Sequence, residues 1–260
     1  MLETHLCLQK GGEILEDFWI KLLGQQTVDF YKIFAANKYY VVIWEGLKWT
    51  LGLTAIALAI GLVIGVLIAL IQITEIRRKN GVLNAISVYG LKFLKWITSL
   101  YIYIIRGTPS ALQIVLMWTV VFATSSLPRI VIGGIAFGIN SGAYMAELIR
   151  AGIQGIDKGQ TEAGRSLGLS YVSTMRYIIL PQAFKQMLPA MVSEFICLIK
   201  ETAIIGFIGG LDLMKAQSII QSRTYNALQP LLMVGLCYLI LTSVLTFFMK
   251  RLEKKLNKSR

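Results

Sequence analysis

The chain contains three long windows without a single charged residue. They cover residues 49–74, 107–128 and 224–249, which gives lengths of 26, 22 and 26 residues. A helix of about 20 apolar residues crosses the hydrocarbon core of a bilayer, and buried helices of soluble proteins are rarely this long without a charge. The pattern therefore predicts a protein that crosses a membrane several times.

We predict an all-α fold, a polytopic bundle of five membrane helices. The fourth predicted helix differs from the others because Glu194, Lys200 and Glu201 interrupt its apolar sequence. Ionisable residues inside a membrane span cost free energy and usually serve a function. The five predicted helices cover residues 41–74, 107–127, 129–149, 187–210 and 228–249.

Small residues recur every four positions in the first and third predicted helices. At this spacing, small side chains lie on one face and let two helix backbones approach closely in lipid. We therefore expect tight helix packing, which says nothing about a substrate. The residues are Ala57, Gly61, Gly65 and Ala69 in the first helix and Gly134, Gly138, Gly142 and Ala146 in the third.

Composition and charge refine this picture. Hydrophobic residues make up 55% of the chain and the net charge is +12. Such a charge would suggest nucleic-acid binding in a soluble protein, but here the basic residues lie beside apolar runs, so membrane topology explains them better. With five spans, one side of the membrane receives 16 lysines and arginines, from 75–105, 147–187 and 250–260, and the other side receives 7. The excess predicts a cytoplasmic C-terminus and an N-terminus outside the cell.

Three parts of the chain follow from this topology. Residues 1–38 carry apolar side chains at helical spacing and predict an amphipathic extracytoplasmic segment, without the basic and then apolar start of a signal peptide. Residues 39–250 form the transmembrane domain, and residues 251–260 form a basic cytoplasmic tail. The three cysteines form no Cys-x-x-Cys pair, so we expect neither a disulfide framework nor a metal site.

The polar segment between the third and fourth predicted helices contains two predicted short helices, within about residues 155–180. Thr161 can cap the first helix, and Gly168 can end it in a left-handed turn. Ser170 can cap the second helix, and Pro181 marks its close. A helix pair outside the membrane is a suitable docking element for a cytosolic partner.

The spacing Glu162-Ala163-Gly164-x3-Gly168-x9-Ile178-x-Leu180-Pro181 resembles the EAA loop of ABC-importer permeases. That family has a second alanine where this chain has Gly164, a departure that is conservative in size but is expected to loosen the first helix. The resemblance implies a type I importer fold in which this loop forms coupling helices that dock into an ATPase subunit. The residues it assigns to ATPase coupling are Glu162, Ala163, Gly164, Gly168, Leu180 and Pro181.

Further segments resemble the polar amino acid subfamily of these permeases. They are Arg106-Gly107-Thr108-Pro109 with Gln113, the run from Asn140 to Tyr144 continuing to Gln160, and Lys200-Glu201-Thr202. The resemblance covers roughly residues 45–250. It implies a bacterial plasma membrane protein with three kinds of partner: an ATPase dimer that binds ATP and Mg, a second or related permease, and an extracytoplasmic amino-acid-binding protein.

Six polar residues are candidates for the translocation pathway. We expect Thr108 to cap a helix that starts at Pro109, so that the helix N-terminus and Arg106 attract a substrate carboxylate. A carboxylate in the fourth helix can hold the ammonium group. The alternative is that the charged residues in the fourth helix form structural ion pairs and that Arg106 only reaches toward the membrane boundary. The candidates are Arg106, Gln113, Asn140, Ser141, Glu201 and Thr202.

The sequence also excludes several functions. It lacks the Gly-x4-Gly-Lys-Ser/Thr phosphate loop, and its one histidine, His5, leaves no credible catalytic cluster. We therefore expect a non-catalytic transport subunit without a cofactor of its own. Two alternatives remain open: an importer permease for another small polar solute, such as an opine or a quaternary amine, and an ion-coupled secondary transporter, although no internal repeat supports the second. An enzyme acting on lipid is remote.

Overall fold

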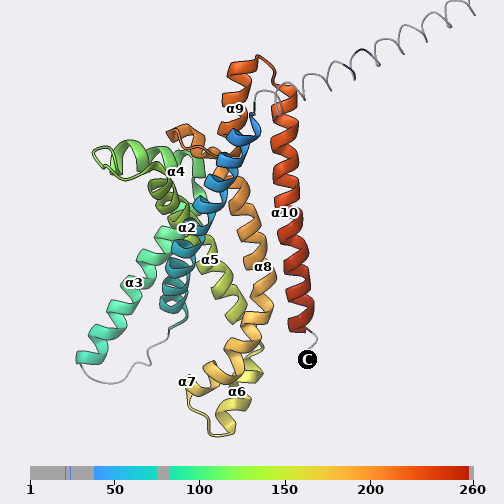
Figure 1. The fold of residues 1–260 in the computed structure, drawn as a ribbon. Helices are drawn as coiled ribbons and strands as arrows, with labels where there is room; N and C mark the ends of the chain where they lie inside the picture. Colours follow the sequence, from blue (N-terminus) through green and yellow to red (C-terminus); the bar gives the residue numbers. More distant parts are fainter. Residues whose placement is uncertain (1–20, 22–23, 25–37, 75–81, 258–260) are drawn as a thin grey trace, which may run out of the picture.

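The computed structural model describes residues 21, 24, 38–74 and 82–257, and its regular elements in that part of the chain are all helices (Figure 1). The predicted amphipathic N-terminal segment therefore lies almost wholly outside the described residues. The longer helices are α2 (Tyr40–Ile73), α3 (Val82–Gly107), α5 (Arg129–Gln154), α8 (Leu180–Glu201) and α10 (Leu228–Asn257). The shorter ones are α4 (Ser110–Leu116), η2 (Met117–Val121), α6 (Lys158–Ser166), α7 (Tyr171–Thr174), η3 (Met175–Ile179), η4 (Thr202–Ile208) and α9 (Leu213–Thr224).

Four helices of the described chain are long and apolar enough to cross a membrane: Tyr40–Ile73, Ile86–Gly107, Arg129–Gln154 and Leu228–Lys255. The helix α8 has 22 residues and is also long enough, but its charged residues lower its hydropathy. Within the described residues five helices therefore have at least 22 residues, and four of them are also apolar enough to be candidate spans. The span assigned to α8 stays a prediction.

The predicted second span, residues 107–127, is wrong. The span is α3, which ends at Gly107, and the predicted range holds only the short α4 and η2. The sequence reading missed α3 because Lys92 and Lys95 interrupt its apolar sequence, although Lys92 is exposed and lies 5.9 Å from the ring centre of Tyr89. Pro109 explains the break after α3, because proline disfavours helical backbone at the residue before it.

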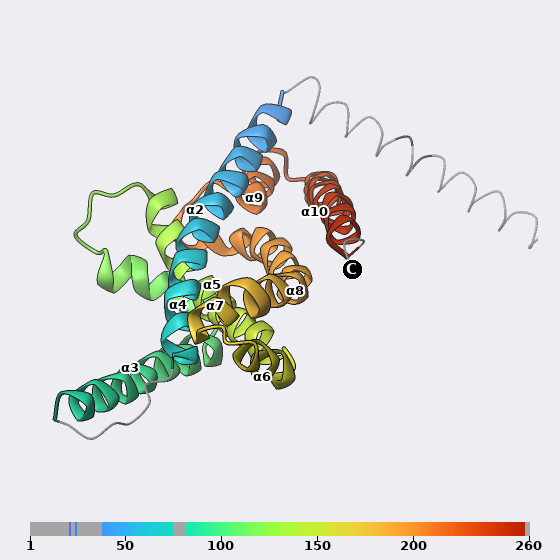
Figure 2. The ribbon, with the colours of Figure 1, turned by 90° about the horizontal axis from the view of Figure 1, so that it is seen from below.

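The helix α5 lies at the centre of the bundle, between α2 and α8 (Figures 1 and 2). In its most apolar window 67% of the residues are buried, against 6% in α3 and in α10. The helix α3 diverges from the bundle, although the Tyr101 hydroxyl donates a hydrogen bond to the carbonyl of Ile139 in α5. The exposed faces of α3 and α10 are therefore surfaces for lipid or for another subunit.

Small residues bring α2 and α5 into backbone contact, which confirms the packing expected from their spacing. A Cβ atom added to Gly65 would lie 2.5 Å from the Cβ of Met145, and one added to Gly138 would lie 2.6 Å from the Cβ of Ile60. Real Cβ atoms do not approach so closely, so neither position can take a larger residue without separating the helices.

The predicted fourth span is displaced. The helix α8 begins at Leu180 rather than at 187, and its α-helical turns end at Glu201, where the 3-10 helix η4 continues to Ile208. Pro189 lies inside α8 rather than at its start. The Ser193 hydroxyl donates a hydrogen bond to the Pro189 carbonyl.

We predict that Gly65→Ala destabilises the permease, because its new methyl group would press against Met145 Cβ and the Ala146 amide nitrogen at 3.1 Å. Overpacking of this kind costs about 1–3 kcal/mol. The matched control is Gly235→Ala in α10, where nothing lies within 4 Å of the added Cβ. Thermal unfolding of the purified protein, followed by fluorescence-detected size exclusion, measures both. Equal melting temperatures for the two variants would contradict the packing argument.

Candidate substrate site and coupling loop

The contact between Asn140 and Gln113 joins the broken α3–α4 segment to the middle of α5. The Asn140 side chain is buried and its Nδ2 donates to Gln113 Oε1 at 2.9 Å. The Gln113 amide nitrogen donates in turn to the Ile105 carbonyl at 2.8 Å and to Thr108 Oγ1 at 2.7 Å. Gln113 therefore stabilises the break after α3 and orients Asn140 at the same time.

Arg106 lies in the last turn of α3, next to this contact. Its guanidinium carbon is 5.2 Å from the ring centre of Tyr144 in α5. The expected helix start is corrected: α4 begins at Ser110, Pro109 occupies the cap position, and the Thr108 hydroxyl donates back to Ile104 instead of capping α4. The helix α4 has only seven residues, so its N-terminus contributes little positive potential. The positive charge at this place therefore comes from Arg106 itself.

Two carboxylates of α8 face the same region. The Glu194 carboxylate lies beside the Ser141 hydroxyl, but the two groups do not form a hydrogen bond. Glu194 also interacts electrostatically with Arg106 and Glu201. Within the described chain, the buried Ser141 hydroxyl oxygen has no hydrogen-bond partner. Sequence reasoning did not assign Glu194 to the site. Its spacing of seven residues from Glu201 was the available signal, because residues seven apart share one face of a helix.

The structure does not bring Thr202 into this cluster. Its side chain is buried, and its hydroxyl donates to the Ile199 carbonyl at 2.6 Å at the start of η4. Thr202 thus serves the turn from α8 into η4. Arg106, Gln113, Asn140, Ser141, Glu194 and Glu201 remain as one polar cluster between α3, α4, α5 and α8.

A cavity opens beside this cluster. It has a volume of about 530 Å³, and its lining includes Arg106 and Tyr103 of α3 together with Glu147 and Arg150 of α5. No group of three or more potential metal-ligating side chains occurs in the part of the chain that the structure describes.

The loop after α5 contains the two expected short helices, with one correction at each end. Asp157, not Thr161, caps α6, since its carboxylate accepts a hydrogen bond from the Gly159 amide at 2.8 Å. Gly168 has the expected positive φ of 85°, and Ser170 caps α7 as predicted, accepting from the Ser173 amide. Pro181 does not close the second helix. The chain continues from α7 through the π-helical turn η3 into α8, where Pro181 lies in the first turn and needs no amide donor.

Gly164 is buried in this loop. A Cβ atom there would lie 2.8 Å from Thr174 Cγ2 and 3.0 Å from Ile178 Cδ1. The helix α6 runs continuously through Gly164, so the missing methyl group allows close packing of α6 against α7 and η3 rather than loosening the helix.

The other loop residues offer an accessible surface. Glu162, Ala163, Gly168, Leu180 and Pro181 are all exposed. Large apolar side chains accompany them, which the sequence analysis did not single out: Leu167 is 82% exposed and Val172 is 72% exposed. Exposed apolar side chains beside a charged residue are typical of a protein–protein contact.

Comparison with known proteins places these features in a family. Residues 81–258 match the family described as "Binding-protein-dependent transport system inner membrane component". A putative glutamine transport system permease protein of Rickettsia bellii is 40% identical over 82% of this chain and 92% of its own length. The arginine transport system permease protein ArtQ of Bacillus subtilis is 38% identical over 82% of this chain and 92% of its own length.

A solved structure agrees with this relationship. The crystal structure of an amino acid ABC transporter with histidines superposes with a TM-score of 0.74 at 38% identity, covering 86% of this chain and 98% of the other. Both the sequence match and the arrangement of the helices point the same way. The chain belongs to the family of binding-protein-dependent transport system inner membrane components.

Proposed function

We propose that this chain is the permease subunit of an ATP-driven importer and forms the translocation pathway for a polar amino acid. The observation that carries the proposal is the polar cluster of Arg106, Asn140, Glu194 and Glu201, in which three helices of membrane length, α3, α5 and α8, bring polar and charged side chains together. Charges in such a place are expensive unless they serve a function. The names of the relatives, which are glutamine and arginine permeases, support an amino acid as the solute.

The chemistry of the cluster matches a zwitterion. Arg106 can donate charge-assisted hydrogen bonds to the α-carboxylate, and Glu194 or Glu201 can accept such bonds from the α-ammonium group. The neutral groups of Gln113, Asn140 and Ser141 can then contact a polar side chain. Ser141 supports this role because its hydroxyl oxygen has no partner among the described residues.

The proposed topology puts the N-terminus outside and the loop of α6 and α7 in the cytoplasm. With α3 as the second span, residues 75–81, the α6–α7 loop and the C-terminal tail all fall on one side. Segment 75–81 contains Arg77, Arg78 and Lys79, and the tail from Lys250 contains six basic residues. This charge distribution supports the orientation.

The importer needs partners that supply energy and substrate. A separate ATPase dimer binds ATP and Mg and docks on the loop, with Glu162, Ala163, Gly168, Leu180 and Pro181 on the contact surface and Gly164 supporting it from beneath. The second permease, a copy or a related chain, encloses the pathway. An extracytoplasmic binding protein delivers the amino acid, and the ATPase cycle shifts the pair between outward and inward access.

We predict that Asn140→Ala and Glu201→Gln weaken the apparent affinity for the transported amino acid by about tenfold or more, the size expected for a hydrogen bond to a charged group. The measurement is ATPase activity of the reconstituted importer at rising concentrations of the loaded binding protein, across the twenty amino acids. Basal ATPase activity should stay near that of the unmodified protein. Unchanged affinity and selectivity in both variants would refute the pathway assignment.

We also predict that Glu162→Ala uncouples the ATPase. The Glu162 carboxylate is exposed on α6, so its loss should leave the fold of the permease intact while transport falls by about tenfold or more, in the range for a lost interfacial ion pair. The control is Glu253→Ala, which removes an acidic residue from the C-terminal end of α10 instead. Transport and co-purification of the ATPase measure both variants. Full transport by Glu162→Ala would exclude this residue from the coupling contact.

A further inference from the structure

A stripe of polar side chains continues along α5 beyond the proposed substrate cluster. It consists of Asn140, Tyr144, Glu147, Arg150 and Gln154. Successive members are three or four residues apart, so they lie on one face of the helix. At 1.5 Å per residue the stripe extends about 21 Å, from the contact with Gln113 to the loop that leads into α6.

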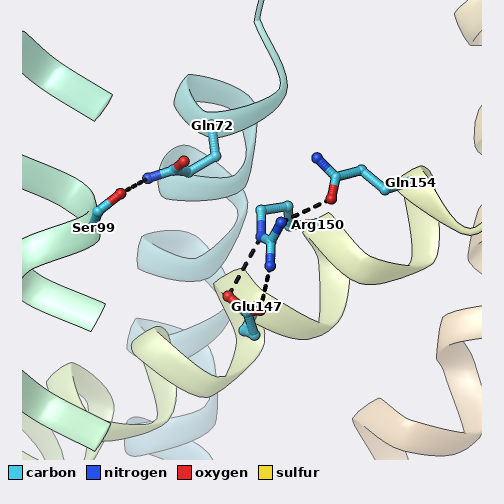
Figure 3. A network of polar contacts seen from close by, with 5 residues as sticks. All are labelled: Gln72, Ser99, Glu147, Arg150 and Gln154. Atoms are coloured by element: carbon cyan, nitrogen blue, oxygen red, sulfur yellow. Dashed lines mark hydrogen bonds and ion pairs between the residues drawn. The ribbon is translucent and has the colours of Figure 1, made fainter. Parts of the chain in front are cut away.

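An ion pair occupies the middle of this stripe (Figure 3). The Arg150 guanidinium donates to the carboxylate of Glu147, and its Nη1 also donates to Gln154 Oε1 at 2.7 Å. Opposite this group, Gln72 of α2 donates to Ser99 Oγ of α3 at 3.0 Å. The Arg150 and Glu147 side chains remain 32% and 30% exposed, so both charges are accessible to a solute.

Two cavities lie along the stripe. The cavity of about 530 Å³ reaches from Arg106 to Glu147 and Arg150. A second cavity of about 600 Å³ reaches from Gln154 to Glu162 in the coupling loop. Gln72 lines both cavities, so the two cavities are neighbours.

The fold gains little from the ion pair itself. Partly exposed pairs three residues apart on one helix contribute little to stability. A pair of opposite charges on a single helical turn does, however, match the α-carboxylate and α-ammonium groups of an amino acid. When a ligand that carries both charges separates Glu147 from Arg150, each of the two side chains gains a ligand group as its new partner. The cost in free energy is therefore small, because neither side chain is left with an unpaired charge.

We propose that Glu147 and Arg150, flanked by Gln72 and Gln154, form a second, exit-side subsite for zwitterionic α-amino acids. Arg150 binds the carboxylate, and Glu147 binds the ammonium group. The subsite rests on the proposed import of amino acids. It holds the solute after it leaves the cluster around Asn140 and before it reaches the cavity beside the coupling loop.

The test uses the complete complex with its ATPase in lipid nanodiscs, without ATP and without the binding protein. The Asn140→Ala background weakens the central cluster, so that the exit side dominates binding. Equilibrium binding is measured for L-glutamine and L-arginine, for their methyl esters, which lack the carboxylate, and for their Nα-acetyl forms, which lack the ammonium group. The variants are Arg150→Gln and Glu147→Gln. The matched control is the exposed pair of Glu45 and Lys48 in α2, also three residues apart, each changed to Gln.

The subsite predicts a crossed pattern. Arg150→Gln weakens binding of the free and acetylated amino acids about tenfold or more, the range for a charge-assisted hydrogen bond, and leaves the esters unchanged. Glu147→Gln weakens binding of the free amino acids and the esters and leaves the acetylated forms unchanged. The control variants change nothing. Equal effects on all three ligand forms, or no effect, would mean a structural ion pair and would overturn the subsite.

Two further outcomes separate folding and function from the subsite. If the charge-neutral variants fail to assemble, Arg150→Lys and Glu147→Asp replace them, because these variants keep each charge. The subsite then requires that the ratio of affinities between the free amino acid and its ester or acetyl form changes in these variants. A constant ratio would overturn it. Unmodified complex that transports no amino acid would overturn the proposed function and the subsite together, whereas transport without the crossed pattern overturns the subsite alone.

Discussion

The close approach of α2 and α5 is the constraint on which the rest of the structure depends. At Gly61, Gly65, Gly138 and Gly142 an added Cβ would lie within about 3 Å of the facing helix, so the interface leaves no room for side chains at these positions. In a bilayer such packing substitutes for the hydrophobic effect that stabilises soluble bundles. One face of α5 is committed to this contact. The remaining faces, which carry Asn140 and Glu147, are therefore free to meet α3, α4 and α8.

Irregular backbone occurs where those polar residues gather. The chain breaks at Thr108 and Pro109 next to Arg106, and α8 gives way to a 3-10 helix directly after Glu201. Inside a membrane, broken helices are tolerated only where they are covered by protein or line a cavity. Gln113 covers one break with hydrogen bonds to the Ile105 carbonyl and Thr108. Thr202 covers the other with its bond to the Ile199 carbonyl.

The sequence predicts the apolar and closely packed parts of this fold better than the polar ones. Charge-free windows locate α2 and α10, and the spacing of small residues anticipates the contact between α2 and α5. The same criterion misses α3, because a helix with an exposed face tolerates Lys92, and it mistakes the apolar α4–η2 segment for a span. Glu194 was overlooked although it lies seven residues from Glu201, because its neighbours Ser141 and Arg106 are brought beside it only by the tertiary structure.

Local signals predict turns better than ends of helices. The predictions of a left-handed turn at Gly168 and of a helix cap at Ser170 are confirmed, because positive φ and amide capping depend on the residue itself. Pro181 misled the prediction because a proline in the first turn of a helix fits a continuing helix as well as a boundary. The continuous helix has a mechanical consequence. Since α7, η3 and α8 form one helical run without an intervening loop, a force applied to the exposed loop reaches Glu194 and Glu201 along a helix. On the other arm, only residues 155–157 separate α6 from α5. The helices α5 and α8 are thus the two arms of one helical hairpin, the α6–α7 loop is its tip, and the polar cluster lies between the arms. A partner that tilts this loop changes the distance between Asn140 on α5 and Glu194 on α8.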